Sequence, residues 1–248
     1  MTILYEDADI VAVDKPAGLL THASQVGRSD LPKQATAESW FKEKYPEVTL
    51  ERPYAHRLDR DTSGVLVFAK NEAAWGLLRK AFTDREVKKT YLAVVLGVPS
   101  EKNGVVDFDI GRSRKDFRLR SAQPKAKGHL RDAITRYEVL GETEEGGGTS
   151  RAQSRGQRYA LLELHPETGR THQIRVHLKA IHHPVVADPL YAPKGAPDLG
   201  IGRLALHAYA LDLPLPSGGR TQIVAPAPTD FALALGHFVG ARERFAAR

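Results

Sequence analysis

The sequence predicts one α+β domain over residues 1–248, with a mixed, mainly antiparallel central sheet flanked by helices and loops. The length fits one large domain or two small ones, and the 42% content of hydrophobic residues is enough for a sizeable core. Short apolar runs rich in β-branched residues and bounded by polar residues are typical of strands. Segments with helical spacing or capping signals lie between and after these runs, and no internal repeat is present.

Two short strands, residues 2–5 and 9–13, are predicted around an acidic turn at the N-terminus. Residues 15–18, Lys-Pro-Ala-Gly, end the second strand, because proline fixes a bend and glycine permits a tight backbone approach. Residues 24–35 are polar and contain glycine and proline, so they are expected to form a loop.

A helix is predicted over residues 36–45, since Thr36 lies near its start and Pro46 follows its end. Its two large aromatic side chains, Trp40 and Phe41, are expected to be core residues.

A buried strand and a second helix come next. Residues 65–69, Val-Leu-Val-Phe-Ala, form a short apolar run that is typical of a buried strand. Asn71 can cap a helix that ends at about residue 83. The apolar side chains of that helix follow helical spacing and should pack on the sheet; they are Trp75, Leu78 and Phe82.

The middle of the chain combines strands with a basic segment. Residues 88–97, 133–140 and 159–164 are predicted strands, and a Gly-rich, polar insertion that begins at Gly141 is expected to be a long, mobile hairpin connection. The basic segment spans Gly111 to Arg131 and its cations are Arg112, Arg114, Lys115, Arg118, Arg120, Lys125, Lys127 and Arg131. Such a charge run is usually a solvated loop, and in a basic protein it is also the best candidate for contact with phosphate groups.

The last third of the sequence predicts two more helices and a strand. Gly169 gives a turn, Thr171 can cap a helix that Pro184 closes, and the apolar face of that helix comprises Ile174, Leu178 and Ile181. Residues 183–191 are expected to form a loop. Residues 203–208 are a predicted core strand in which His207 is structural. Residues 229–247 are predicted to form an amphipathic helix, whose apolar residues include Phe231, Leu233, Leu235 and Phe238.

The composition and the charge of the chain limit the classes of function that it can have. The formal net charge of +6 and a pI of about 9.5 favour a polyanionic partner, although many basic proteins bind no nucleic acid. The absence of cysteine excludes disulfides, thiolate zinc sites and a cysteine nucleophile. The N-terminus lacks the basic start and long apolar core of a signal peptide, and no apolar run is long enough to span a bilayer. A cytoplasmic protein without membrane contact is therefore expected.

The most informative stretch runs from His56 to Lys70, where ionised residues precede the predicted buried strand. Charges at the mouth of a buried strand can be held rigidly over a cleft. A turn with surface ion pairs is the more usual fate of such a cluster. The residues alone leave these two interpretations about even. The charged residues concerned are Arg57, Asp59, Arg60 and Asp61.

A resemblance to a known family favours the first interpretation. His56-Arg57-Leu58-Asp59, followed by Thr62-Ser63-Gly64 and an apolar strand, resembles the signature of the RluA-type pseudouridine synthases. The stretch around Tyr91 resembles the second motif of the family. Thr168-Gly169-Arg170-Thr171-His172-Gln173-Ile174-Arg175 resembles its Thr-Gly-Arg-x-His-Gln-Ile-Arg motif. The resemblance extends from about residue 3 to residue 240, and it implies the pseudouridine synthase fold without the small N-terminal RNA-binding domain of some relatives.

The resemblance also implies roles for individual residues. Asp59 corresponds to the catalytic carboxylate, Tyr91 to the tyrosine beside the target base, and Arg175 to the basic residue that pairs with the catalytic aspartate. A buried carboxylate resists ionisation, and a neighbouring arginine favours the charged form. Arg57 corresponds to the arginine that helps to occupy the space left by the flipped base, and residues 15–18 to a stretch that walls the cleft.

Structured RNA, a stem-loop of ribosomal or transfer RNA, is the expected partner of a monomeric enzyme. The expected RNA-binding residues are His56, Arg57, Arg60, Lys88, Lys89, Arg112, Arg114, Lys115, Arg170 and His172. No cofactor is expected, because the isomerisation needs neither a redox agent nor an energy donor. No metal site is expected either, since His172 and His177 do not share a helical face and no His-Glu-x-x-His pattern occurs.

Three functions are compatible with these features to different degrees. The first is an isomerase that converts specific uridines in RNA to pseudouridine. The second is a noncatalytic RNA-binding or ribosome-assembly protein on the same fold, which replacement of Asp59, Tyr91 or Arg175 would have favoured. The third, a hydrolase that uses Asp59 with a histidine, ranks last because the chain has no nucleophile elbow. The target uridine and the chemical route of Asp59 stay open.

Overall fold

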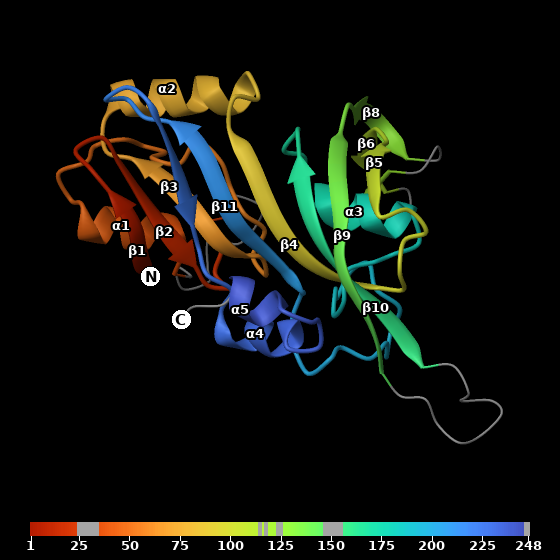
Figure 1. Ribbon diagram of the computed structural model, residues 1–248. Helices are drawn as coiled ribbons and strands as arrows, with labels where there is room; N and C mark the ends of the chain where they lie inside the picture. Colours follow the sequence, from red (N-terminus) through yellow and green to blue (C-terminus); the bar gives the residue numbers. More distant parts are fainter. Residues whose placement is uncertain (24–34, 114–115, 117–118, 123–125, 146–155, 246–248) are drawn as a thin grey trace. The chain divides into compact units, whose positions relative to one another are not determined.

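The computed structural model describes residues 1–23, 35–113, 116, 119–122, 126–145 and 156–245 (Figure 1). The chain forms two compact units. The first comprises Met1–Lys88 with Ala208–Ala225, and the second comprises Lys89–His207 with Pro226–Arg248. The expectation of a single catalytic domain over residues 1–248 stays a prediction. None of the described helices has the length and the apolar composition needed to cross a lipid bilayer.

The first unit is built on antiparallel strand pairs. Its strands, in sheet order, are β1 (Thr2–Glu6), β2 (Ile10–Lys15), β3 (Ser63–Ala69), β11 (Leu206–Pro214, from Ala208 on in this unit) and β12 (Arg220–Val224). The pairs β1–β2, β2–β3 and β11–β12 are antiparallel. Every residue of β3 is buried, so the apolar run that the sequence assigned to a buried strand is confirmed.

Two helices of the first unit begin at capping residues. They are α1 (Ala37–Lys44) and α2 (Glu72–Thr83). The side chains of Thr36 and Asn71 each accept a hydrogen bond from a backbone amide in the first turn, at 3.0 and 2.9 Å. Such a cap stabilises a helix by about 1 kcal/mol. Both predicted helices are thereby confirmed, with ends within two residues of the expected ones.

The core of the first unit confirms most of the expected packing. Leu78 of α2 lies fully buried against Val65 and Val67 of β3, and Trp75 and Phe82 pack against the same cluster while partly buried. Phe41 of α1 is fully buried and stacks on Phe68, with ring centroids 4.7 Å apart. Trp40 is only partly buried, so its assignment to the core was wrong. Successive helical residues point about 100° apart, and Phe41 takes the inward direction.

The second unit is also built on antiparallel strand pairs, and Figure 1 shows β9 and β10 as its long hairpin. Its main strands, in sheet order, are β4 (Lys88–Leu96, from Lys89 on in this unit), β10 (Gln157–Pro166), β9 (Ile134–Glu145) and β5 (Asn103–Asp107). Its helices are α3 (Gln173–Ala180), α4 (Thr229–Leu235) and α5 (Ala241–Phe245). The antiparallel pairings and the segregated helices confirm the predicted α+β class.

The described residues of the basic segment include three short strands that form a small sheet, where the sequence favoured a loop. Its central strand β6 (Ile110–Arg112) pairs antiparallel with both β7 (Arg120–Ser121) and β8 (Lys127–Arg131). Strands as short as β6 and β7 are too short to show a period-two alternation in the sequence. Arg114, Lys115, Arg118 and Lys125 of this segment lie outside the described residues.

Other boundaries also differ from the expected ones. Strand β9 continues through Gly141 to Glu145, which pairs with Gln157, so the hairpin is confirmed but the strands reach into the expected insertion. The remainder of that insertion and residues 24–34 of the expected N-terminal loop lie outside the described residues. The strand predicted at residues 203–208 begins at Leu206, and its His207 is fully buried as expected.

The expected C-terminal helix is broken in two. Helices α4 and α5 are separated by a segment from Gly236 to Gly240, and Gly240, directly before α5, adopts a φ of +70° that a continuous helix cannot contain. Phe231, Leu235 and Phe238 are buried as an apolar face requires, with exposures of 0, 0 and 2%. Leu233 is 56% exposed, because it lies two positions from both Phe231 and Leu235 in α4 and therefore points about 200° around the helix from them.

A buried polar network fixes the start of α3. The residue before the helix is His172, at φ 58° and ψ 21° without a side-chain cap, so the expected cap by Thr171 was wrong. The amide of Gln173 provides the anchor instead: its Nε2 donates to the hydroxyl of Thr135 (3.1 Å), and its Oε1 accepts from the hydroxyl of Thr168 (2.7 Å). The helix is thereby tied to β9 and to the turn that precedes it.

The network ends at His177, which is fully buried. Its Nε2 lies 3.0 Å from the carbonyl oxygen of Phe108, and its Nδ1 lies 2.9 Å from the hydroxyl of Thr135. A carbonyl can only accept, so Nε2 carries the proton and Nδ1 accepts from the hydroxyl. Burial lowers the pKa of His177 from its ordinary value of 6.5, against the smaller raising effects of the Phe108 carbonyl and of Asp107.

This lowered pKa predicts an acid-sensitive fold. The unfolded chain binds a proton at His177 below about pH 6.5, while the folded chain resists it, so the contribution of His177 to stability is complete above that pH and lost as the pH falls. We expect the free energy of unfolding of the wild type to fall more steeply between pH 6.5 and 5 than that of His177→Gln, by up to about 1.4 kcal/mol per pH unit.

Urea unfolding at several pH values measures both slopes. His182→Asn is the matched control, because it replaces an exposed histidine just beyond the same helix, at a left-handed position that asparagine tolerates. Equal pH slopes for the wild type and His177→Gln would contradict the prediction.

Candidate active site

The loop that carries Asp59 lies directly before β3 and is fixed through its backbone. The Thr21 hydroxyl donates to the carbonyl oxygen of Leu58 (3.0 Å) and accepts from its amide (3.2 Å). The amide of Thr62 donates to the carbonyl oxygen of Asp59 (3.2 Å). Leu58 is 6% exposed, whereas Arg57 is exposed and Asp59 is half-buried. A buried leucine thus anchors the loop between two charged neighbours.

Lys15 provides a second anchor for this loop, although it is a fully buried lysine. Its ammonium group donates to the carbonyl oxygens of Pro16 (2.9 Å), Leu19 (2.8 Å) and Arg60 (3.1 Å). The amide of Gly18 donates to the same Arg60 oxygen (2.9 Å). These bonds satisfy a charge that would otherwise be costly to bury.

The stretch at residues 15–18 therefore holds the backbone of the residue that follows Asp59. The sequence led us to expect a wall of the cleft at this stretch, and the anchoring role of Lys15 was not foreseen. The signal that could have revealed it is a lysine at the end of a strand that begins with four apolar residues, Ile-Val-Ala-Val-Asp-Lys.

His56 anchors the loop from its other side. The segment before His56 lies alongside β3 in space. There, the amide of Ala69 donates to the carbonyl oxygen of Pro53 (2.7 Å). Further along, the amide of Val67 donates to Nε2 of His56 (3.0 Å), so an imidazole takes the place of a backbone carbonyl as the chain turns away. The ring also stacks on Phe82, with centroids 4.6 Å apart. The contact of His56 with RNA stays a prediction.

Gly64 marks the point where β3 begins next to β11. Its φ is +116°, a conformation that favours glycine, and a Cβ at this position would lie 2.1 Å from the carbonyl oxygen of Ala208. The two residues before it, Thr62 and Ser63, are buried. The glycine of the Thr-Ser-Gly stretch is therefore required by the close approach of two strands.

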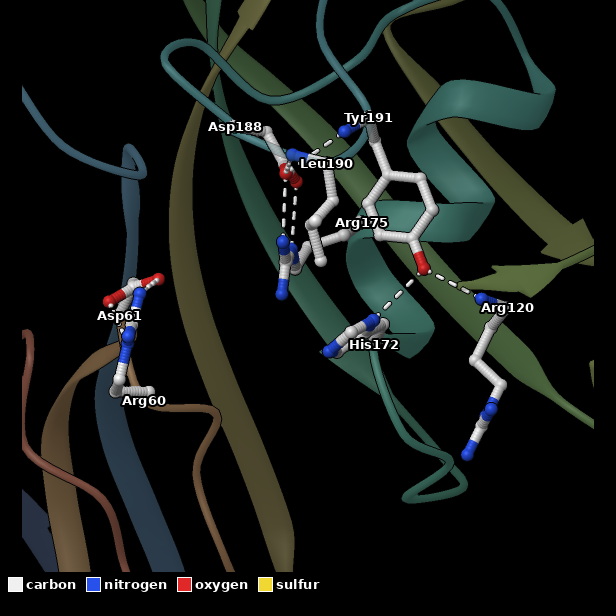
Figure 2. Close-up of polar contacts among 8 residues, drawn as sticks. All are labelled: Arg60, Asp61, Arg120, His172, Arg175, Asp188, Leu190 and Tyr191. Atoms are coloured by element: carbon white, nitrogen blue, oxygen red, sulfur yellow. Dashed lines mark hydrogen bonds and ion pairs between the residues drawn. The ribbon is translucent and has the colours of Figure 1, made fainter. Parts of the chain in front are cut away.

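Arg60 and Asp61 form an ion pair with each other, as Figure 2 shows. Nε of Arg60 donates to Oδ1 of Asp61 (2.9 Å) and Nη2 donates to Oδ2 (3.2 Å). The Arg60 side chain is 57% exposed, and exposed pairs of this kind contribute at most about 1 kcal/mol. The expected contact of Arg60 with RNA stays a prediction.

Tyr91 lies in the second unit, in β4, opposite Leu164 of β10. Its side chain is partly exposed. Lys88 at the start of the strand is exposed, while the Lys89 ammonium group donates to the carbonyl oxygen of Thr168 (3.1 Å). Lys89 thus holds the turn before α3, a role that was not expected from the sequence.

Arg175 of α3 forms a buried ion pair with Asp188 (Figure 2). Its Nε donates to Oδ2 (2.7 Å) and its Nη2 to Oδ1 (2.8 Å), and the two side chains are 4 and 0% exposed. Oδ1 of Asp188 also accepts from the amides of Leu190 (2.9 Å) and Tyr191 (3.1 Å). This two-pronged geometry fixes the guanidinium plane.

The sequence predicted a loop around Asp188 but did not identify it as the partner of Arg175. The signal was present in the sequence: Asp188 is the only acid in the apolar run from Val185 to Leu190, and a buried acid needs a partner.

His172 and Arg170 flank the same helix start. The hydroxyl of Tyr191 lies 2.9 Å from Nδ1 of His172 and accepts from the amide of Arg120 in β7 (2.9 Å), as Figure 2 shows. Arg170 pairs with Asp132, its Nη2 lying 2.7 Å from Oδ1. The second unit therefore brings His172 and Arg175 to one cluster.

The expected residues thus fall into two groups. Asp59 belongs to the first unit, together with His56, Arg57, Arg60 and Lys88. The second unit contains Tyr91, Lys89, Arg112, Arg170, His172 and Arg175. Arg112 is exposed, and the roles of all these residues stay predictions. Among the described residues, no group of three or more histidine and acidic side chains could hold a metal ion.

Comparisons with known proteins place this geometry in context. Residues 9–180 match the sequence pattern of the RNA pseudouridylate synthase family. The chain is 36% identical to ribosomal large subunit pseudouridine synthase D of Xanthomonas campestris, over 93% of this chain and 67% of that protein. It is 34% identical to tRNA pseudouridine synthase C of Haemophilus ducreyi, over 85% of this chain and 84% of that protein.

A solved structure is similar as well. The human RNA pseudouridylate synthase domain containing 1 protein superimposes with a TM-score of 0.72 at 28% identity, over 92% of this chain and 83% of that chain. The likeness in fold therefore extends over both units.

Proposed function

The chain belongs to the RNA pseudouridylate synthase family and is an enzyme that forms pseudouridine in RNA, and we propose that it modifies specific uridines of structured ribosomal or transfer RNA with Asp59 as its catalytic carboxylate. The observation that carries the proposal is the loop at Asp59. Its backbone is held at Leu58 by Thr21 and at Arg60 by Lys15, so a half-buried carboxylate is presented on a rigid support.

The reaction suits a single positioned carboxylate. Pseudouridine formation breaks the bond between C1′ of ribose and N1 of uracil, turns the base, and joins C1′ to C5. The proton on C5 is lost and N1 ends with a proton, so no oxidant, reductant or energy donor is consumed. A carboxylate can attack the sugar, attack the base, or act as a base at the sugar. We assign Asp59 to this role without choosing among the routes.

Two residues of the second unit complete the proposed chemistry. Arg175 would keep Asp59 ionised, and its Nε and Nη2 bonds to Asp188 support this role by fixing the guanidinium group. Tyr91 would stack its ring on uracil and use its hydroxyl for proton transfer. Its partial exposure at the strand surface is compatible with contact to a base.

The target uridine must leave its stack in folded RNA to reach a carboxylate. Arg57 is exposed and lies two positions before Asp59 on a loop whose intervening Leu58 is buried. We propose that Arg57 helps to occupy the space that the flipped base leaves. We also expect the enzyme to act as a monomer in the cytoplasm.

The names of two relatives support ribosomal and transfer RNA as the substrate classes to test first. Pseudouridine should be mapped in both RNA classes from cells that lack this chain and from cells in which it is restored. We expect one or a few uridines to lose the modification and to regain it on restoration. An unchanged map in both classes would contradict the proposed substrates.

RNA affinity is expected to depend steeply on salt, because phosphate contacts release counterions. Neutralising Arg112, Arg114 and Lys115 together, each to Gln, should flatten the slope of log affinity against log salt by about 0.7 to 0.9 for each phosphate group that is no longer neutralised. The matched control removes equal charge from exposed cations of the first unit, Lys42, Lys44 and Arg79. A slope that changes equally in both variants would show that the basic segment acts only through net charge.

A further inference from the structure

We propose that Tyr191 is a positioning residue for the reaction. Its ring holds Arg175, and its hydroxyl determines which nitrogen of His172 carries the proton. The same hydroxyl connects these residues to strand β7. The proposal rests on the function proposed above for Arg175. Tyr191 lies in the loop after α3, is 4% exposed, and belongs to none of the motifs that the resemblance provided with a role. Figure 2 shows it between His172, Arg120 and the Arg175–Asp188 pair.

The hydroxyl of Tyr191 has two partners of different character. The backbone amide of Arg120 can only donate, and it does so to the hydroxyl oxygen at 2.9 Å. Nδ1 of His172, also at 2.9 Å, can accept the hydrogen of the hydroxyl. We infer the directed chain from the Arg120 amide through the Tyr191 hydroxyl to Nδ1, which leaves the imidazole proton on Nε2. His172 then offers a hydrogen-bond donor at Nε2 while it is neutral.

The ring of Tyr191 makes a cation–π contact with the guanidinium group of Arg175. The guanidinium carbon lies 5.1 Å from the ring centroid, and the Lys179 ammonium group lies 5.4 Å from it. Cation–π contacts of this kind are stronger when they are desolvated, as the 3% exposure of Arg175 indicates. Tyr191 also belongs to an apolar cluster of buried residues, whose other members are Ile110, Ala122, Ala133 and Val176.

The backbone of Tyr191 completes the link. Its amide donates to Oδ1 of Asp188, the same oxygen that accepts from Nη2 of Arg175. Ring and amide of one residue therefore hold the guanidinium and its counterion together. A shift of this loop would move Asp188 and Arg175 with it.

Strand β7 belongs to the basic segment that we propose contacts phosphate. Its Arg120 reaches the cluster through a backbone amide, so the bond does not depend on the arginine side chain. The hydroxyl of Tyr191 thus provides a hydrogen-bonded connection between this small sheet and the residue that holds Arg175. Removing that hydroxyl should disturb the cluster while the ring stays in place.

Tyr191→Phe tests the proposal with two readouts. Nitrogen NMR of histidine-labelled protein without RNA should show one His172 tautomer, protonated at Nε2, in the wild type and a mixture in the variant. The single-turnover rate on saturating RNA should fall about tenfold, since misplaced catalytic groups lower rates steeply, while RNA affinity should stay within about twofold. Tyr191→Leu, which also removes the ring, should lower the rate about a hundredfold.

Tyr159→Phe is the matched control, because it deletes another buried tyrosine hydroxyl of the same unit, one that lies 3.4 Å from Glu145. It should leave the tautomer and the bound-state rate unchanged. The proposal is overturned if Tyr191→Phe lowers only the melting temperature, or if His172 keeps one tautomer without the hydroxyl. Failure of the proposed function would appear differently, as a wild type that forms no pseudouridine although its His172 shows the expected tautomer.

Discussion

Asp59→Asn should abolish pseudouridine formation while it leaves the fold and RNA binding intact. The change removes the charge and the nucleophilic carboxylate but alters little volume, and catalytic nucleophiles typically contribute several orders of magnitude to a rate. The bonds that hold the loop at Leu58 and Arg60 involve backbone atoms, so they persist in the variant. Single-turnover assays, with nucleosides separated by chromatography after digestion, should detect at least about a thousandfold loss.

Asp61→Asn is the control for this experiment. Asp61 lies two positions further along the same loop and pairs with Arg60 at the surface. If the carboxylate of Asp59 is the catalytic group, the Asp61 variant should keep a rate close to that of the wild type. Near wild-type turnover by Asp59→Asn would refute the assignment of Asp59.

Arg175→Met should also lower the bound-state rate by orders of magnitude, because Asp59 would lose the charge proposed to keep it ionised. The structure adds a second consequence. Asp188 has a side chain of 0% exposure, and the variant would leave its charge buried without Arg175. Breaking a buried pair from one side typically costs about 3–5 kcal/mol, so the free energy of unfolding should fall by that amount.

A double variant separates the two effects. Arg175→Met combined with Asp188→Asn removes both charges, so most of the stability should return, while the bound-state rate should remain low. Arg175→Lys should rescue the rate partially, since lysine supplies the charge without the two-pronged geometry. RNA affinity should change little in all of these variants. A double variant that regains the wild-type rate would show that Arg175 acts on stability alone, and a loss confined to RNA affinity would make Arg175 a phosphate contact.

Local signals in the sequence predicted the parts of the fold that local physics decides. Asn71 caps α2 as expected, because an N-cap needs only its own first turn. The apolar run at residues 65–69 is buried in β3, because its composition leaves no other stable place for it. The break between α4 and α5 depended on a glycine conformation at Gly240, and a hydrophobic pattern does not reveal φ.

The functional residues also divide into those that the sequence could indicate and those that only the tertiary structure reveals. Motif residues such as Asp59 and Arg175 could be proposed from resemblance, but the groups that hold them could not. Asp188, thirteen positions after Arg175, becomes its partner only when the chain folds back beside α3. Lys15 reaches Arg60 across forty-five positions of sequence. Contacts of this separation are products of tertiary structure, and a single sequence gives for them only the hint of a charged residue in an apolar run.

The most direct test of the central claim uses RNA in which uridine carries tritium at C5. Joining C5 to the ribose releases that label to water, so release reports the proposed reaction and neither binding nor hydrolysis of the RNA chain. We predict that the purified wild type releases tritium from ribosomal or transfer RNA of cells that lack the protein, in step with new pseudouridine, while Asp59→Asn releases none. Binding of that RNA by the wild type without tritium release, or equal release by the Asp59 variant, would contradict the claim.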